Sequence, residues 1–103
     1  MEEQNLNIIK SIISNILPGC EIILFGSRAR GNYCENSDYD LLVCIKDQLS
    51  IDEKRALQAR IRRELAKFMI PADVIVFYKK EFESKSSVLN HLAATVKREG
   101  ILI

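Results

Sequence analysis

Two aspartates stand two residues apart, ten residues after a Gly-Ser pair, and their spacing suits metal chemistry. Asp38 and Asp40 flank Tyr39, and Gly26-Ser27 precede them. On a strand the two carboxylates would project to one face, with about 6.6 Å between them along the strand. Carboxylates held this close repel each other, and a divalent cation removes the conflict because magnesium prefers carboxylate oxygens. Asp38 and Asp40 are therefore candidate ligands of a divalent metal.

The Gly-Ser pair interrupts an apolar run and has the properties of an anion-binding turn. Gly26 has no side chain, so a ligand can approach its backbone closely. Ser27 can cap a short helix that follows it, which leaves N–H groups and a hydroxyl directed at an anion. A phosphate cradle beside a metal-binding pair describes a nucleotide site.

Each feature by itself also has a common structural explanation. Gly-Ser turns are frequent, and an isolated Asp-X-Asp is more often a solvated strand end or an Asx-turn than a metal site. The two features occur here in a fixed order, each beside an apolar strand, and this combination favours the site.

The elements that would carry these residues follow from the spacing of apolar side chains. Residues 22–25 predict a buried strand, and residues 39–45 predict a second one that opens at the carboxylates. Between them, residues 28–30 can start a short helix, and a polar loop runs over residues 31–37. The turn and the carboxylates would thus lie at the ends of two neighbouring strands.

Two amphipathic helices are predicted around these strands. Apolar residues at helical spacing predict a first helix over residues 3–17, ended by Pro18-Gly19. Its stripe consists of Leu6, Ile9, Ile12, Ile13 and Ile16. Ser50 and Glu53 form a capping box that opens a long helix reaching about Phe68. The inward stripe of this helix consists of Leu57, Ile61, Leu65 and Phe68.

A third apolar strand is predicted over residues 72–78 and carries a third acidic candidate. The connection from the second strand spans a whole helix, so this pair of strands is expected to be parallel or mixed rather than a hairpin. Asp73 stands at the start of the third strand. A lone aspartate there is usually a turn residue, but beside a two-carboxylate site it is the candidate for a third acidic group.

The remaining residues predict a last helix and an apolar end. The helix is expected over residues 86–98, where it would bury Val88, Leu89, Leu92 and Val96. Residues 100–103 are too apolar for a free tail and indicate docking or an interface. His91, the single histidine, is expected to be structural or to lie on the surface.

Composition narrows the class of protein. With 103 residues, 48% hydrophobic and 28% charged, the chain is expected to form a single domain over residues 1–103. The net charge of +1 argues against strong nucleic-acid binding, and no apolar run approaches the roughly 20 residues of a membrane span. Three cysteines without a CxxC pair indicate reduced thiols and a cytoplasmic protein.

The outer face of the long helix is basic. It carries Lys54, Arg55, Arg60, Arg62, Arg63 and Lys67. The face could meet nucleic acid or an acidic partner, but acidic residues are interspersed and a solvated face is the favoured interpretation.

These residues together give the sequence a recognisable signature. Gly26-Ser27, ten residues and Asp38-Tyr39-Asp40, within GSRARG…SDYDLLV, resemble the minimal nucleotidyltransferases of the DNA polymerase beta-like superfamily, including the MntA-like antitoxins. The resemblance covers nearly the whole chain and maps the third family carboxylate onto Asp73. It implies an α/β (α+β) fold with a mixed sheet flanked by helices.

The resemblance also implies a chemistry and a partner. ATP and two Mg²⁺ ions would be held between Ser27 and the metal ligands Asp38, Asp40 and Asp73. Members of the antitoxin branch transfer AMP to a tyrosine of a HEPN-domain toxin, so a HEPN partner is expected. Arg28 and Arg30 either offset phosphate charge or pair with structural carboxylates. Arg30 ranks slightly higher because on a helical turn it shares the face of Ser27 more nearly.

Three functions from different classes remain open at this point. The leading hypothesis is an adenylyl-transferring antitoxin. The first alternative is a module that binds nucleotide and partner and neutralises the partner by contact, without catalysis. The second is nucleotidyl transfer to a small molecule or RNA, for which a partner subunit would have to supply the acceptor pocket. The acceptor, the base preference and the oligomeric state, homo- or hetero-oligomeric, are not encoded in any motif.

Overall fold

Four strands form one mixed sheet in the computed structural model, which describes residues 2–88 and 91–103. The strands are β1 (Glu21–Phe25), β2 (Tyr39–Ile45), β3 (Ala72–Tyr78) and β4 (Ile101–Leu102), in the order β3-β2-β1-β4. β1 is antiparallel to both β2 and β4, whereas β2 and β3 are parallel. The mixed sheet, the parallel pair and the bounds of the second and third strands confirm the predictions.

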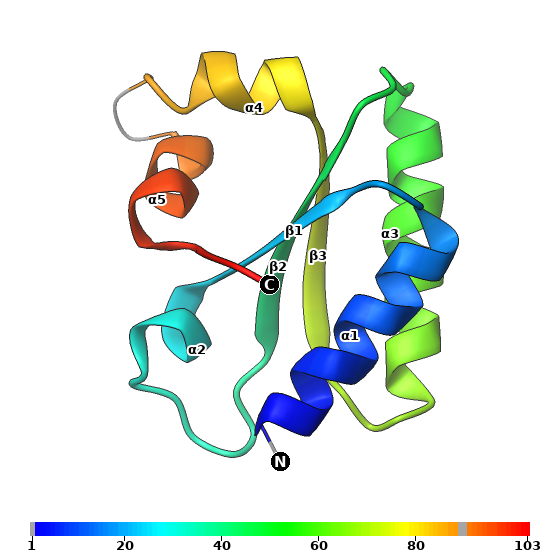
Figure 1. The fold of residues 1–103 in the computed structure, drawn as a ribbon, viewed down its shortest axis with the longest axis vertical. Coiled ribbons are helices and arrows are strands. Elements are labelled where there is room, and N and C mark those ends of the chain that lie inside the picture. The colour runs from blue at the N-terminus through cyan, green and yellow to red at the C-terminus, as the bar shows by residue number, and fades with distance from the viewer. Residues whose placement is uncertain (1, 89–90) are drawn as a thin grey trace.

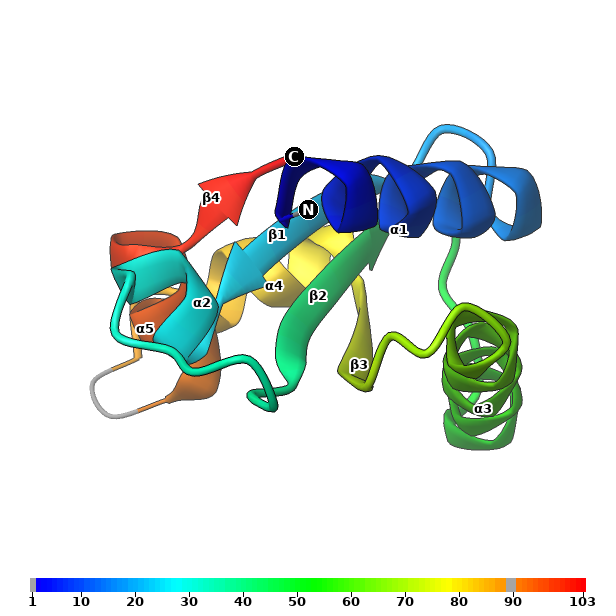
Figure 2. The same ribbon diagram turned by 90° about the horizontal axis from the view of Figure 1, so that it is seen from below.

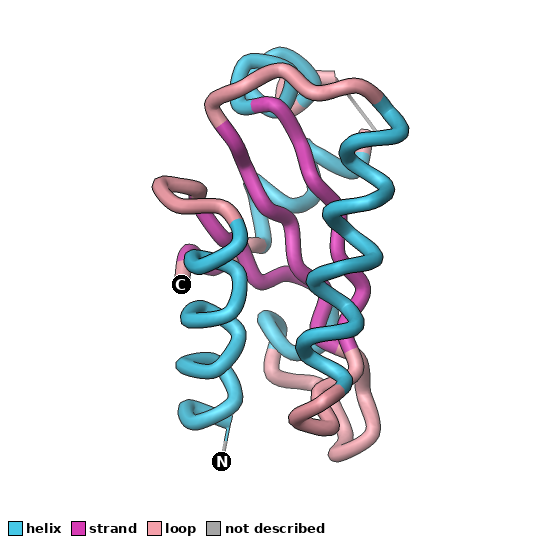
Figure 3. The backbone as a smooth tube through the Cα atoms, turned by 90° about the vertical axis from the view of Figure 1, so that its right-hand side faces the viewer, coloured by secondary structure: helices cyan, strands magenta, loops and turns pink. Residues whose placement is uncertain are grey.

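Helices cover both faces of the sheet. They are α1 (Glu2–Ile16), α2 (Gly26–Arg30), α3 (Ile51–Ala66), α4 (Lys79–Lys85) and α5 (Leu92–Glu99). Figure 1 shows α1 and α3 on one side of the strands and α4 and α5 on the other. Seen from below, α2 lies at the end of β1, near α5 (Figure 2). α1 and α3 run beside each other in front of the sheet (Figure 3) and are in contact.

Alternation along the strands divides the apolar side chains into two cores. The core under α1 and α3 contains Ile9, Ile13, Ile22, Leu24, Leu41, Val43, Ile61, Leu65, Val74 and Val76. The core under α4 and α5 contains Phe25, Leu42, Cys44, Phe82, Ala93 and Val96, with Ile23, Ile75 and Phe77 packed against it. Because side chains alternate with a period of two, Asp40 and Asp73 fall on the α4/α5 side, while Tyr39 is buried in the other core.

The predicted capping box opens α3, but the helix ends earlier than predicted. The Ser50 Oγ accepts from the Glu53 N–H at 3.1 Å, and Glu53 Oε1 accepts from the Ser50 N–H at 2.9 Å. α3 stops at Ala66, so Phe68 lies beyond it and is 56% exposed. Its predicted inward position is wrong because Met69, at φ 58°, reverses the chain and Ile70 enters the core instead.

The predicted last helix begins six residues later than expected, because α5 starts only at Leu92, and α4, which ends before the predicted range, was not predicted. α4 follows β3 directly, and the Ser86 and Ser87 hydroxyls donate to the carbonyls of Glu83 and Ser84, competing with helix propagation. His91 then caps α5, where its Nδ1 accepts from the Ala93 N–H at 3.0 Å. Val96 is buried as predicted, Val88 and Leu92 are exposed, and Leu89 lies outside the described residues.

The apolar end of the chain docks on the sheet, as predicted. β4 pairs with β1, and the Ile103 N–H donates to the Ile22 carbonyl at 2.9 Å. Among the helices of the described residues, none has the length and apolar character needed to span a bilayer.

Candidate functional site

The structure brings the predicted carboxylates to one end of two parallel strands. Asp40 on β2 and Asp73 on β3 are partners in the strand register, and they lie on the same face of the sheet. Asp38 immediately precedes β2. Burial, and after it the charges of Asp73 and Asp38, raise the pKa of Asp40, whereas the charge of Arg30 lowers it. Two carboxylates, those of Asp73 and Asp38, therefore act electrostatically on the third, Asp40.

Gly26 lies directly against the Asp40 carboxylate. Phe25 and Asp40 are partners in the antiparallel register, which places the next residue of the turn beside the Asp40 side chain. Gly26 has φ 74°, and a Cβ built on it would overlap Asp40 Oδ2. Both the backbone conformation and the missing side chain are thus required at Gly26.

Ser27 lies in the first turn of α2 and does not cap it. α2 begins at Gly26 with Phe25 as its N-cap residue, and no side chain caps this end. The predicted capping role of Ser27 is therefore wrong. The Ser27 carbonyl accepts from the N–H groups of Gly31 and Asn32, at 2.9 and 3.2 Å, so the residue closes the small turn. Its position beside Gly26 keeps it next to the carboxylates.

The two predicted arginines have different surroundings. Arg28 donates from Nε to the Ser37 carbonyl at 3.0 Å and from Nη2 to the Glu35 carbonyl at 3.1 Å. Arg30 forms an exposed ion pair with Glu99 at 3.4 Å and is the cation that lowers the pKa of Asp40. Arg30 therefore has an electrostatic effect on Asp40.

The donor set of the carboxylates fits magnesium in its chemistry, but the side chains are not gathered around one point. Among residues 2–88 and 91–103, no three His, Cys, Asp or Glu side chains converge as a ready-made metal site. All the donors offered by Asp38, Asp40 and Asp73 are carboxylate oxygens, the ligands that magnesium prefers. Mutual repulsion separates such side chains when no cation lies between them, so metal binding would require the carboxylates to rotate.

The contact between Tyr39 and Asn5 was not predicted from the sequence. The Tyr39 side chain is 1% exposed, and its hydroxyl accepts from Asn5 Nδ2 at 3.1 Å. A cavity of about 480 Å³ opens beside it. Its lining consists of Gln4, Asn5, Arg28, Tyr33, Glu35, Asn36 and Tyr39. The sequence does indicate the direction of the Tyr39 side chain, since a residue between two carboxylates on a strand must point to the opposite face.

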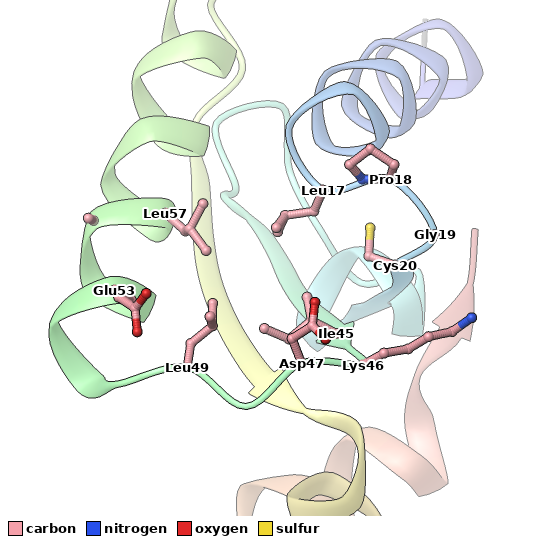
Figure 4. Close-up of a pocket in the computed structure, with 11 residues that line it drawn as sticks. Leu17, Pro18, Gly19, Cys20, Ile45, Lys46, Asp47, Leu49, Glu53 and Leu57 are labelled. Carbon is pink, nitrogen blue, oxygen red and sulfur yellow. The ribbon is translucent and has the colours of Figure 1, made fainter.

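Another cavity, of about 590 Å³, lies at the other end of the strands (Figure 4). Leu17, Leu49 and Leu57 point into it from the turn after α1, the loop before α3, and α3. Asp47 and Glu53 are the acidic residues of its lining, and Glu53 is engaged in the capping box. Gly19 also lines this cavity, but nothing lies within 4 Å of a Cβ built on it, so no carboxylate lies against this glycine as Asp40 lies against Gly26. The candidate site remains at Asp38, Asp40 and Asp73.

Known proteins share both the sequence pattern and the fold. A family model described as "Nucleotidyltransferase domain" matches residues 6–98. A curated protein of Methanocaldococcus jannaschii, named as a candidate protein adenylyltransferase, is 38% identical over 58 residues. That match covers 56% of this chain and 59% of the relative, which is less than two thirds of its length.

Solved structures of low sequence identity have the same fold. A complex of tri-AMPylated Shewanella oneidensis HEPN toxin with MNT antitoxin aligns with a TM-score of 0.64 and 20% identity, over 99% of this chain and 71% of that chain. A candidate nucleotidyltransferase from Sulfolobus solfataricus aligns with a TM-score of 0.66 and 24% identity, over 96% and 76%. At these identities the likeness shows the arrangement of helices and strands alone.

Proposed function

Because the chain belongs to the nucleotidyltransferase domain family, we propose that it transfers AMP from ATP to a hydroxyl of a protein partner and is the antitoxin of a toxin–antitoxin pair. The observation that carries the proposal is the Asp40 carboxylate, which lies against the Gly26 turn and beside Asp73. The partner would be a HEPN-domain protein modified on a tyrosine. In support, one structural neighbour is a complex of an AMPylated HEPN toxin with its antitoxin.

The roles of the residues follow from the charges that the reaction must stabilise. The acceptor oxygen attacks the α-phosphorus of ATP, a new P–O bond forms, and pyrophosphate leaves with the electron pair of the broken bond. Asp73 accepts the proton of the acceptor hydroxyl. The Ser27 hydroxyl and Arg30 hold the departing pyrophosphate. Asp38, Asp40 and Asp73 would hold two Mg²⁺ ions, which supply stabilisation of the attacking and leaving oxygens.

A labelling experiment tests the proposal directly. When the wild-type chain is incubated with radiolabelled ATP, magnesium and a candidate HEPN-domain partner, we expect the partner to become labelled. Asp38→Asn removes a metal ligand and should abolish the label, whereas Asp47→Asn, in the exposed loop at the other end of β2, should leave it intact. A wild-type chain that labels no partner would contradict the proposal.

Neutralisation by contact alone is the second candidate, and one surface feature favours it. Phe68 and Met69 are consecutive and are 56% and 89% exposed, which is unusual for large apolar side chains. Such a pair suits an interface with a protein partner. If an Asp38→Asn/Asp40→Asn double variant still protects cells from the toxin in full, contact rather than catalysis is the mechanism.

Transfer to a small molecule or RNA ranks last. The net charge of +1 supplies little attraction to a polyanion. Transfer of the label to RNA in the absence of any protein acceptor would favour this hypothesis over the other two.

A further inference from the structure

The Arg28 side chain joins the turn that carries Ser27 to the loop that delivers Asp38. Nε and Nη2 of one guanidinium donate to two backbone carbonyls, those of Ser37 and Glu35, at 3.0 and 3.1 Å. Ser37 directly precedes Asp38 in the chain. A planar guanidinium presents its donors in a fixed fork, so two acceptors held by it are fixed relative to each other and to the turn.

The same guanidinium is braced by aromatic rings. Its Cζ lies 4.0 Å from the centre of the Tyr39 ring and 4.6 Å from that of Tyr33. Both distances are within the range of cation–π attraction. Tyr39 is almost fully buried and hydrogen-bonded to Asn5, so it is a rigid support. Arg28 is thus anchored on the residue that stands between the two carboxylates of the pair.

The segment over residues 31–37, here named the carboxylate loop, has local contacts apart from Arg28. Among the described residues, its other hydrogen bonds include that of the Ser37 N–H to the Cys34 carbonyl at 3.0 Å and that of the Cys34 N–H to the Ser37 hydroxyl at 3.1 Å. These bonds close a turn within the loop and do not tie that turn to the sheet. The sheet begins only after Asp38, where the Tyr39 N–H donates to the Pro71 carbonyl at 2.9 Å.

We propose that Arg28 is a positioning residue, which holds Asp38 in place for metal binding by fixing the carboxylate loop, and that it does not act as a ligand of the nucleotide phosphates. The proposal rests on the proposed function, in which Asp38 helps to bind magnesium with ATP. Groups that orient metal ligands typically contribute about 10- to 100-fold to metal affinity or activity. A phosphate ligand would instead contribute to ATP affinity whether or not a metal is present.

Calorimetric titration with ATP separates the two roles. The Kd of ATP is measured in EDTA and in excess magnesium, and the ratio of the two values is the magnesium-dependent gain. For Arg28→Ala, we expect an unchanged Kd in EDTA and a gain reduced at least about tenfold. Arg28→Lys should behave like Arg28→Ala, because one ammonium cannot reproduce the fork or the stacking. Arg55→Lys, on the exposed face of α3, is the matched control and should match wild type.

The outcomes distinguish a failure of the positioning role of Arg28 from a failure of the proposed function on which it rests. If wild type shows no magnesium-dependent gain, the proposed function fails and the inference with it. If wild type shows the gain and Arg28→Lys keeps it, or if Arg28→Ala weakens ATP equally with and without magnesium, the positioning role is overturned while the proposed function stands.

Hydrogen exchange tests the loop without any ligand. Amides of residues 32–38 should exchange faster in Arg28→Lys than in wild type, while amides of the core strands β1 to β3 keep their protection. Unchanged exchange in the carboxylate loop would overturn the proposal. Thermal unfolding of each variant, compared with Arg55→Lys, checks that the fold is retained. If Arg28→Ala does not fold, the results for Arg28→Lys decide between the two roles of Arg28.

Discussion

At the scale of single residues, the site depends on Gly26 and Asp40 restricting each other. Gly26 provides a left-handed conformation and an absent side chain, and the Asp40 carboxylate fills the space in which a Cβ would lie. Asp40 in turn is partly withdrawn from water and lies near two further carboxylates, which raises its pKa. The ionised Asp40 carboxylate therefore opposes folding at this position.

Gly26→Ala should damage the site more than a matched glycine substitution does. Gly19 has a similar φ of 82° with nothing within 4 Å of a built Cβ, so Gly19→Ala carries the backbone strain alone. Both variants are expected to lose about 1–2 kcal/mol of unfolding free energy from the left-handed conformation, and Gly26→Ala should lose more and also bind MgATP weakly. Chemical denaturation and ATP titration measure the two effects. Equal losses with unchanged ATP binding would contradict the geometry.

Asp40→Asn should stabilise the metal-free protein at neutral pH. The folded-state pKa of Asp40 is raised, mainly by burial and then by Asp73 and Asp38. Its ionisation therefore opposes folding, and this cost appears as pH rises from the ordinary carboxyl range through the raised pKa. We expect a higher Tm for Asp40→Asn at pH 7 in EDTA, and a smaller difference at acid pH where Asp40 is protonated.

The exposed Asp47→Asn is the control for this prediction and should leave the Tm unchanged at both pH values. A Tm of Asp40→Asn below that of wild type at pH 7, or a difference independent of pH, would refute the electrostatic account of the site.

At the scale of elements, α3 makes the site possible by carrying the chain from β2 to β3. A parallel pair needs such a crossover, and the register that results sets Asp40 opposite Asp73. α3 starts at the capping box and packs Ile61 and Leu65 into the core. Its polar Gln58 also accepts from the Val76 N–H at 2.9 Å, which ties the helix to β3.

Ser50→Ala should weaken this crossover. Removing the hydroxyl leaves the Glu53 N–H without its cap, and loss of a serine N-cap typically costs about 1 kcal/mol. Denaturant unfolding should show this loss, while Ser14→Ala, on the exposed face of α1, should be neutral or slightly stabilising because alanine favours helix interiors. A Ser50→Ala variant as stable as Ser14→Ala would indicate that the box does not hold α3.

At the scale of the whole molecule, the fold sorts three thiols into different environments. Cys44 is buried in the core, where burial raises its pKa to about 11, and burial also raises the pKa of Cys20. Cys34 is exposed in the carboxylate loop, and the hydrogen bond from Ser37 lowers the pKa of its thiol.

Alkylation should follow this order. With limiting iodoacetamide near neutral pH, we expect modification of Cys34 first, because it is accessible and has the largest thiolate fraction. Peptide mass mapping identifies the labelled residue, and Cys34→Ser should remove the fast phase. Earlier labelling of Cys44 would show that the core opens more readily than the packing indicates.

Local patterns in the sequence predicted most of the helices and strands and the position of the candidate site. Apolar runs predicted β2 and β3, helical spacing predicted α1, and Ser50 with Glu53 predicted the start of α3, because each depends on residues within a few positions of one another. The Gly-Ser turn and the aspartate pair identified the site for the same reason. Local pattern failed at Phe68, at the start of the last helix and for α4, which it did not predict.

Only the tertiary structure decided how the parts of the site meet. The facing of Asp40 and Asp73 depends on the register of two strands joined through α3, and the contact of Gly26 with Asp40 depends on the pairing of β1 with β2. The tie between Arg28 and the carboxylate loop depends on the direction in which α2 leaves β1. Each of these contacts joins segments that come together only when the chain folds. The periodicity within either segment therefore does not encode the contact.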